Sequence, residues 1–271
     1  MTTAQKVIKY LALALAIFLC ISIIGGVCAA AVGIIGAITD TGGDALGEMQ
    51  TYEVGGEISS LSVSISGAGL EIKTADSFSV KSNYNYISVS SENGKLTVSE
   101  TKKPRPYISD ELIVTVSIPK DFIFDEATVK TGAGTVDIDG LAASVLSVSL
   151  GAGEASFKNL TATVRAEIEG GAGKMTVDGG LLHNFKLDMG AGELTLKCRI
   201  TGDSCIDYGM GATHLTLIGA REDYKIKVDK GIGDARLEGE QMQDGSVYGA
   251  GENYIEVDGG IGAIDIHFVS E

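Results

Sequence analysis

LGAGEASF (Leu150–Phe157), GGAGKMTV (Gly170–Val177) and MGAGELTL (Met189–Leu196) each place Gly-Ala-Gly between two short runs of alternating apolar and polar residues. Alternation with a period of two is typical of a β-strand that has one buried face and one solvated face. The pattern returns about every 20 residues, and a repeat of this length indicates a solenoid or a related array. The three stretches therefore predict strands that are joined at glycines in a repeating unit.

The first glycine of each motif defines the frame of the repeat. These glycines are Gly132, Gly151, Gly171, Gly190, Gly211 (written Gly-Ala-Thr), and Gly231 and Gly260 (both Gly-Ile-Gly). The intervals between them are 19, 20, 19, 21, 20 and 29 residues. In this frame, the third position before each glycine and the sixth after it are apolar in every repeat. We expect these two columns to form the core.

The motif itself is expected to be a corner between two strands. Apolar residues fall at odd positions before the motif and at even positions after it, so the chain must absorb one residue there. Glycine tolerates the backbone conformation that such a bend needs and lets neighbouring coils stack closely. The predicted corner glycines are Gly132, Gly134, Gly151, Gly153, Gly171, Gly173, Gly190, Gly192, Gly211, Gly231, Gly233, Gly260 and Gly262. The fold class is therefore all-β, a single-stranded β-solenoid (β-helix) of about 20 residues per coil.

Departures from Gly-Ala-Gly are expected to change the packing at the corner. We expect the central Ala to point inward, where a larger side chain would meet its equivalent in the next coil. Thr213 then replaces the third glycine in one coil, and Ile232 and Ile261 replace Ala in two others. These replacements predict a locally wider core.

The regular coils are predicted to cover residues 127–271 of a solenoid that spans residues 57–271. An earlier coil is visible at LSVSISGAGLEI (Leu61–Ile72), with its corner at Ser66-Gly67-Ala68, and residues 57–126 are predicted to form less regular coils. The last strand, DIHFVSE, leaves an open end in this scheme. The insertion at residues 240–253 is either a cap over that end or a recognition loop.

The N-terminal region predicts a membrane anchor and a tether. Residues 10–39 contain no charged residue and are long enough for a transmembrane helix, with Lys6 and Lys9 before them and acidic residues after them. By the positive-inside rule, residues 1–39 are a cytoplasmic N-terminus and signal-anchor helix, and the C-terminal domain is extracytoplasmic. Residues 40–56 are predicted to be a glycine-rich tether. The alternative is a signal peptide cleaved near Ala31, which would release a secreted adhesin.

Small residues recur at four-residue spacing within the predicted membrane helix. They are Gly25, Ala29, Gly33 and Ala37. Such a face lets two helices approach closely, so it predicts a packing face for a homodimer. The alternative is that Gly and Ala are simply frequent in membrane helices.

Charge narrows the range of partners. The net charge is −15, and beyond residue 39 there are 19 basic and 36 acidic residues, a balance of −17. Such a surface repels nucleic acid phosphates and anionic lipid headgroups, so no nucleic acid partner is expected. Cationic groups or divalent ions are electrostatically compatible with it, as is an ordinary solvated acidic face.

Two sequence patterns resemble catalytic or metal sites. Asp137 and Asp139 point the same way on one strand, about 7 Å apart, and paired carboxylates serve in polysaccharide hydrolysis. The alternative is a mixed polar face, because the neighbouring coils carry Ser, Thr and Lys in these columns. GGIGAIDIH (Gly259–His267) resembles a calcium-binding repeat, but its Asp265 falls one place late. No motif predicts a cofactor or a metal site, so we expect a non-enzymatic protein.

Two cysteines flank one predicted turn between strands. Cys198 and Cys205 are separated by six residues. Outside the cytoplasm, a disulfide between them would clip this turn, whereas the sequence leaves their separation in space open.

The combination of these features resembles a known bacterial family. A membrane helix, the strand VTVSIPKDF (Val114–Phe122) and coils such as VKTGAGTVDIDGL (Val129–Leu141) are similar to the family of unknown function labelled "putative adhesin", of the toast-rack type. The resemblance covers about residues 57–271 and implies a β-solenoid domain in envelope proteins, often associated with envelope-stress response. It brings no catalytic residues to this chain. We therefore expect a membrane-anchored envelope protein that binds an unknown envelope protein or polymer, with an envelope polysaccharide hydrolase or lyase as the alternative.

Overall fold

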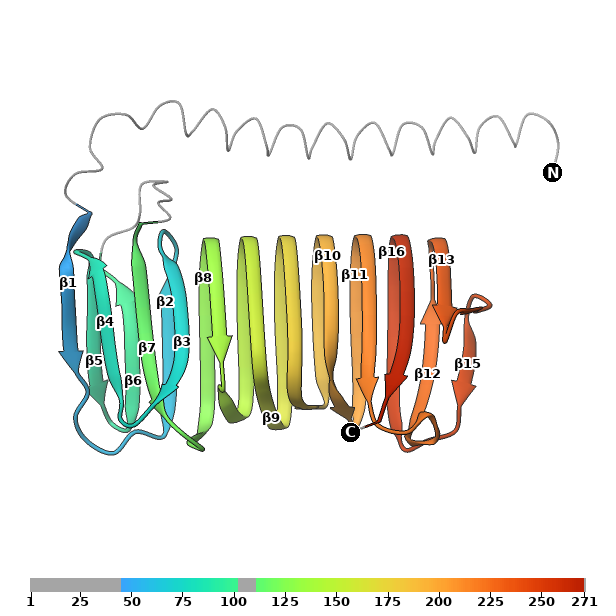
Figure 1. Cartoon of the computed structure of the whole chain (residues 1–271), viewed down its shortest axis with the longest axis horizontal. Helices are drawn as coiled ribbons and strands as arrows, with labels where there is room; N and C mark the ends of the chain where they lie inside the picture. The colour runs from blue at the N-terminus through green and yellow to red at the C-terminus, as the bar shows by residue number, and fades with distance from the viewer. Residues whose placement is uncertain (1–44, 102–110, 271) are drawn as a thin grey trace, which may run out of the picture. The chain divides into compact units, whose positions relative to one another are not determined.

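The computed structural model describes residues 45–101 and 111–270 of the 271-residue chain. These residues form one sheet that winds into a stack of coils (Figure 1). The strands are β1 (Leu46–Glu53), β2 (Ser60–Ile65), β3 (Gly69–Ala75), β4 (Ser79–Tyr84), β5 (Ile87–Glu92), β6 (Lys95–Glu100), β7 (Ile113–Pro119), β8 (Ile123–Asp139), β9 (Ala142–His183), β10 (Phe185–Thr201), β11 (Asp203–Ile218), β12 (Tyr224–Asp229), β13 (Ile232–Leu237), β14 (Glu240–Gln241), β15 (Ser246–Gly249) and β16 (Asn253–Val269). One short 3-10 helix, η2 (Arg221–Asp223), links β11 to β12.

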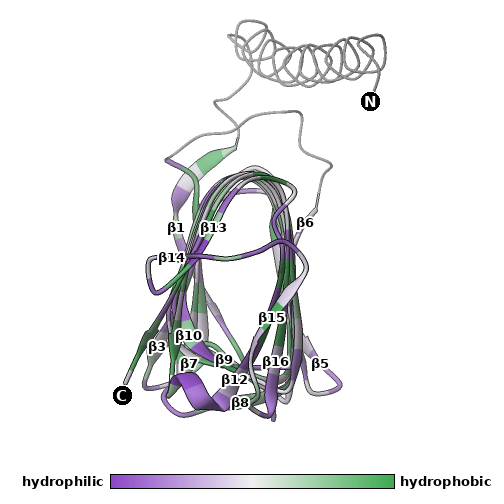
Figure 2. Ribbon diagram, turned by 90° about the vertical axis from the view of Figure 1, so that its right-hand side faces the viewer, coloured by the Kyte–Doolittle hydropathy of each residue, from purple (hydrophilic) through white to green (hydrophobic). Residues whose placement is uncertain are grey.

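Each regular coil has two broad sides that meet at an arch (Figure 2). The arches contain the Gly-x-Gly motifs, and successive coils pair in parallel register. For example, Ala133 pairs with Ala152, and Ala172 pairs with Ala191. The prediction of an all-β architecture built from parallel coils is therefore confirmed.

The two predicted apolar columns form the core. Before the arches, Val129, Val148, Ile168 and Leu187 are fully buried, and the column after the arches is equally buried. Burial of such a side chain contributes roughly 1.5–3 kcal/mol relative to leaving it exposed. Because every coil repeats both columns, each coil is stabilised mainly by the two coils that flank it.

The glycine at the third position of each Gly-x-Gly arch, called the third glycine below, permits close stacking of backbones. Gly173 has φ +138° and Gly192 has φ +136°. A Cβ atom added at Gly173 would overlap the carbonyl oxygen of Gly153 in the neighbouring coil, and one added at Gly192 would overlap that of Gly173. Any side chain at this position therefore meets both backbone strain and a steric clash.

The residue between the two glycines does not point inward, so this expectation was wrong. Ala152 and Ala172 are exposed, Ile261 is 39% exposed and Ile232 is 56% exposed. This residue lies at the apex of the arch, and its side chain projects outward from the bend. The isoleucines therefore do not widen the core.

The predicted position of the Gly-x-Gly motif in the β11 coil was also wrong. Gly192 pairs with Gly211 and Ala191 with Met210, so the arch of β11 is Gly209-Met210-Gly211 rather than Gly211-Ala-Thr. A shift of two residues keeps every side chain on the same face of a strand, so apolar alternation cannot distinguish the two frames. Thr213 is a fully buried residue after the arch, not a replacement for glycine.

The order of coils in the stack differs from their order in the chain. β16 pairs with β11 on one side and with β12 and β13 on the other, so the last coil of the sequence lies inside the stack. The coil at the end of the stack is β12–β13. It is covered by β15 and β14, which pair antiparallel with β12 and β13. The expected open end after DIHFVSE is therefore wrong, and strands within the insertion at 240–253 cover a different coil.

The other end of the stack is also out of chain order. The β2–β3 coil lies between β8 on one side and β6 and β7 on the other. Its corner falls at Ser66-Gly67-Ala68 as predicted, because the amide of Ala133 donates to the carbonyl of Ser66 (3.3 Å). The Glu100 carboxylate accepts hydrogen bonds from the amides of Ser66 (2.8 Å) and Gly67 (3.0 Å) at this corner.

The predicted tether and anchor have different outcomes. Residues 46–53 form β1, an edge strand antiparallel to β4, so eight of the 17 residues of the expected tether at 40–56 are part of the sheet. The predicted membrane segment at 10–39, with Gly25, Ala29, Gly33 and Ala37, lies outside the described residues. In the part of the chain that the structure describes, no helix is long and apolar enough to span a membrane.

Replacing the third glycine of a central arch should destabilise the stack strongly. We expect Gly173→Ala to lower the free energy of unfolding by roughly 2–5 kcal/mol, because the strain of a positive φ adds to a backbone clash. Gly239→Ala is the matched control, because Gly239 has φ +80° but open space around the added Cβ. It should cost only about 1–2 kcal/mol. Denaturant unfolding of both variants measures the difference, and equal losses would refute the stacking argument.

Candidate binding face

One broad side of the stack carries side chains in straight rows. This side, the pre-arch face, consists of the outer surfaces of β5, β6, β2 and of the segments that precede each arch, continuing to β12. Neighbouring strands lie about 4.8 Å apart, and side chains in equivalent positions line up across them. The row nearest the arches runs Ser88, Ser99, Ser64, Lys130, Ser149, Glu169, Asp188, Asp207, Asp258 and Asp229.

The first half of the pre-arch face is a hydroxyl field. A second row, two residues further from the arches, carries only hydroxyl side chains across five strands. The hydroxyl field comprises Ser88, Ser99, Ser64 and Ser149 of the first row and Ser90, Thr97, Ser62, Thr128 and Ser147 of the second. Short polar side chains on a regular sheet give a flat surface of hydrogen-bond donors and acceptors.

The second half of the first row is an acidic ladder. Its five carboxylates are Glu169, Asp188, Asp207, Asp258 and Asp229, on consecutive strands. Like charges on neighbouring strands repel each other. Some partners reduce this repulsion, because Lys186 Nζ lies 3.7 Å from Asp188 and Lys227 Nζ lies 2.7 Å from Asp229.

Asp258 is the carboxylate of the acidic ladder whose pKa is raised by its surroundings. Partial burial raises its pKa above the usual value of 3.8, and the charges of Asp207, Asp229 and Glu256 raise it further. The positive charge of Lys227 lowers the pKa of Asp258. The Lys227 ammonium itself has a raised pKa, because it donates to Asp229 and to Glu256, each at 2.7 Å.

Two groups of described residues that could hold a metal ion combine members of the acidic ladder with a neighbouring side chain. One is Cys205, Asp207 and Asp258, and the other is Asp229, Glu256 and Asp258. In each group the ligand atoms lie within 4.8 Å of one another. Two carboxylates of the second group already bind the Lys227 ammonium. The arrangement attracts cationic groups, and Lys227 is one such group from the chain itself.

The opposite side, the post-arch face, alternates its charges. Lys174 Nζ lies 3.3 Å from Glu193, and Lys197 Nζ lies 3.6 Å from Asp178 on the neighbouring coil. Asp137 and Asp139 lie exposed on this face, away from the acidic ladder. Asp139 accepts a hydrogen bond from Asn159 Nδ2 (3.1 Å), and Asp137 is in register with Ser156. The mixed polar surroundings expected as the alternative are therefore what the structure shows.

The two cysteines do not form the disulfide that was considered. Both are free thiols, Cys198 buried in the core and Cys205 half-buried on the pre-arch face. Burial raises the pKa of Cys198 to about 12. Burial, and then the charges of Asp207, Asp258 and Glu256, raise that of Cys205 to about 11. The two thiols point to opposite sides of the sheet, which explains why the short sequence separation does not produce a bond.

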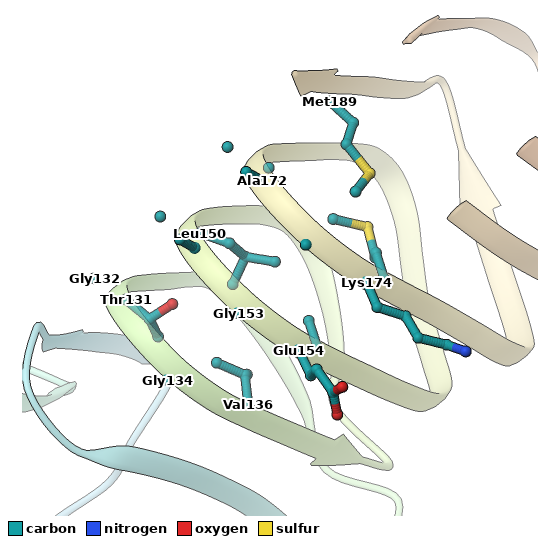
Figure 3. A pocket seen from close by; sticks show the side chains of 17 residues that line it. Thr131, Gly132, Gly134, Val136, Leu150, Gly153, Glu154, Ala172, Lys174 and Met189 are labelled. Atoms are coloured by element: carbon teal, nitrogen blue, oxygen red, sulfur yellow. The ribbon is translucent and has the colours of Figure 1, made fainter. Parts of the chain in front are cut away.

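The cavity beneath the central arches is small. Leu150 and Met189 lie among its lining residues, together with the arch glycines (Figure 3). Its volume is about 20 Å³, which is close to the space that one water occupies. Met175 and Gly170 explain why it is so small, because the Met175 methyl occupies the space next to Gly170 that a side chain there would need. This cavity does not accommodate an organic substrate.

The sequence indicates four of the five acidic positions of the ladder, but not that the five carboxylates form one continuous row. Glu169, Asp188, Asp229 and Asp258 share a column in the predicted frame. Asp207 falls outside that column when Gly211 is taken as the first glycine of its coil. Placing Gly209 first would have completed the row, and the intercalation of β16 then brings Asp258 between Asp207 and Asp229.

The fold and its rows of side chains define a β-solenoid domain with exposed, regular faces. Residues 58–249 match the model of the Toastrack DUF4097 family. The match covers well over half of the chain, and this protein therefore belongs to that family. No curated protein matches the sequence.

The solved structures that match this chain come from several bacteria. One is described as a putative cell adhesion protein from Clostridium sporogenes ATCC 15579, with 18% identity, TM-score 0.44 and coverage of 82% of this chain and 99% of that chain. Another is a putative adhesin from Parabacteroides distasonis ATCC 8503, with 11% identity, TM-score 0.35 and coverage of 82% and 98%. A third is a putative adhesin from Bacteroides fragilis NCTC 9343, with 10% identity, TM-score 0.29 and coverage of 80% and 95%.

Neutralising Asp258, the carboxylate of the acidic ladder with a raised pKa, should stabilise the fold at neutral pH. A raised pKa in the folded state means that stability is lost as the pH rises above the unfolded value of 3.8. We therefore expect Asp258→Asn to melt at a higher temperature than the wild type at pH 7 and at the same temperature at about pH 3, where the carboxyl is protonated in both states.

The matched control for this prediction is Asp188→Asn. Asp188 belongs to the same row but lies 3.7 Å from the Lys186 ammonium, so its replacement removes an attraction together with the repulsion. Its melting temperature at pH 7 should change less. A gain for Asp258→Asn that is as large at about pH 3 as at pH 7 would contradict an electrostatic origin.

Proposed function

We propose that this protein is a membrane-anchored, non-enzymatic binding module of the bacterial cell envelope. In this proposal, residues 10–39 anchor the chain in the cell membrane with the N-terminus in the cytoplasm. The solenoid stands outside and holds an envelope protein or polymer on its pre-arch face. Family membership and the uncharged N-terminal segment support the envelope setting.

The observation that carries the binding role is the row nearest the arches on the pre-arch face. It changes from hydroxyls, interrupted by Lys130, to five successive carboxylates at a constant strand spacing. A partner that is extended and has repeating polar or cationic groups would meet equivalent side chains on each successive coil. Because the sheet already holds these side chains in rows, little ordering of the protein is needed on binding.

The orientation of the chain can be tested on intact cells. We expect external protease to remove a tag from the C-terminus while residues 1–39 stay in the membrane fraction. Spheroplasts serve as the control for shielding by the cell wall. A tag that stays protected in spheroplasts and is cut only after lysis would refute the extracytoplasmic placement.

The binding face can be tested by co-sedimentation with isolated envelope fragments of the host bacterium. The double variant Asp188→Asn, Asp207→Asn removes two carboxylates of the acidic ladder. We expect it to bind at least about tenfold more weakly, which corresponds to the loss of about 1.4 kcal/mol.

The matched control is the double variant Asp137→Asn, Asp139→Asn on the post-arch face. It removes the same charge from the opposite side and should bind as the wild type does. Weaker binding of this control with normal binding of the ladder variant would contradict the proposal. Such a result would instead favour Asp137 and Asp139, the carboxylate pair predicted as the alternative site for polysaccharide hydrolysis.

A further inference from the structure

The C-terminal coil occupies a slot between two other coils. β16 pairs along its length with β11, from Asp203↔Tyr254 to Ile218↔Val269. On its other side it pairs with β12 and β13. Its inward residues Ile255, Val257, Ile264 and Ile266 are all buried. The walls of this slot are therefore two coils that precede β16 in the chain.

The link between the two walls is built to leave room for a coil. Successive arch glycines in the regular part are 19 or 20 residues apart, but Gly209 and Gly231 are 22 apart. The additional length lies in the segment from Ile218 to Tyr224, which contains η2. The Tyr224 hydroxyl donates to the Ile218 carbonyl (2.8 Å), and the Tyr224 ring lies 5.7 Å from that of Phe268 in β16. This segment spans two coil spacings rather than one.

A single short hinge joins β16 to the rest of the described stack. β15 and β16 flank β12 on opposite sides, so residues 250–252 must cross the start of β12. The amide of Gly251 donates to the Tyr224 carbonyl (3.2 Å). A Cβ atom at Gly251 would overlap the backbone of Asp223 and Tyr224, and one at Gly249 would overlap the Tyr224 carbonyl oxygen. The crossing is therefore as tight as glycine allows.

The other intercalated coil lacks this freedom. The β2–β3 coil continues into β1 on one side and into β4 on the other, and both strands are part of the sheet. Removal of β16, the last described strand, would leave its neighbours β11 and β12 joined to each other through η2.

We propose that the C-terminal coil is exchanged between two copies of this protein, so that β16 of each copy fills the slot of the other. An empty slot would expose two unpaired strand edges and apolar core residues, so it must be filled. A second copy supplies the same contacts as the chain's own coil. A short hinge such as residues 250–252 favours exchange between copies.

The cysteine at the wall of the slot makes the exchange directly measurable. Cys205 of β11 lies in register with Glu256 of β16 on one side and with Lys186 of β10 on the other. A cysteine at either position is adjacent to Cys205. β10 and β11 are successive coils of one wall, so a bond to position 186 stays within one chain in both forms.

The experiment uses the full chain with Cys20→Ser and Cys28→Ser, co-expressed with two different tags in membranes. Glu256→Cys is oxidised in one sample and Lys186→Cys in the other, and the products are separated without reductant. We expect Glu256→Cys to give a disulfide-linked dimer that carries both tags, and Lys186→Cys to give a bond within one chain. A third variant, Glu256→Cys with Cys205→Ser, controls for collisions and should give no dimer.

Each other result overturns the proposal. A bond within one chain for Glu256→Cys means that the chain fills its own slot. The absence of any bond there, while Lys186→Cys forms one, means that β16 does not lie beside β11. Equal amounts of dimer with and without Cys205 mean that position 256 of one copy does not lie beside Cys205 of another, which refutes the exchange.

Discussion

The structure depends on the contact between the backbones of neighbouring arches. At the third position of every arch from Gly153 onward, the chain has a positive φ and approaches a carbonyl oxygen of the neighbouring coil too closely for any side chain. Glycine therefore lets the hydrogen bonds of the parallel ladder hold successive coils at the strand spacing of about 4.8 Å through the bend as well. The buried columns and the straight rows on both broad sides follow from it, because every coil repeats the same positions at the same height.

The same regularity explains why chain order and stack order can differ. A coil presents nearly the same edge to any neighbour, so the repeat alone does not encode which coil lies next to which. The connections do. η2 lengthens the link between β11 and β12 by the amount needed to pass one coil, and glycines at 249 and 251 allow the return crossing to β16. Specificity of order therefore resides in a few linking residues rather than in the repeats.

The sequence was sufficient to predict what depends on local alternation. The buried columns at Val129 and Ile138, the corner at Ser66-Gly67-Ala68 and the parallel coils were all predicted. The frame of the β11 coil was not, because a shift of two residues leaves the alternation unchanged. The position of β16 was not predicted either, because strand pairing between distant coils has no local signal. The acidic ladder depends on both, so only its separate members were visible in the sequence.

The two broad sides differ in how their charges are arranged from coil to coil. On the post-arch face, acidic and basic residues alternate from coil to coil and form ion pairs such as Lys174–Glu193. On the pre-arch face, five carboxylates follow one another, and partial burial, together with the charges of Asp207 and Asp229, raises the pKa of Asp258. The alternating arrangement was available to the same scaffold and would have avoided the repulsion. Departures from local consistency of this kind tend to occur at functional surfaces. The raised pKa of Asp258 therefore marks a part of the pre-arch face where repulsion between carboxylates and partial burial reduce the stability of the stack at neutral pH.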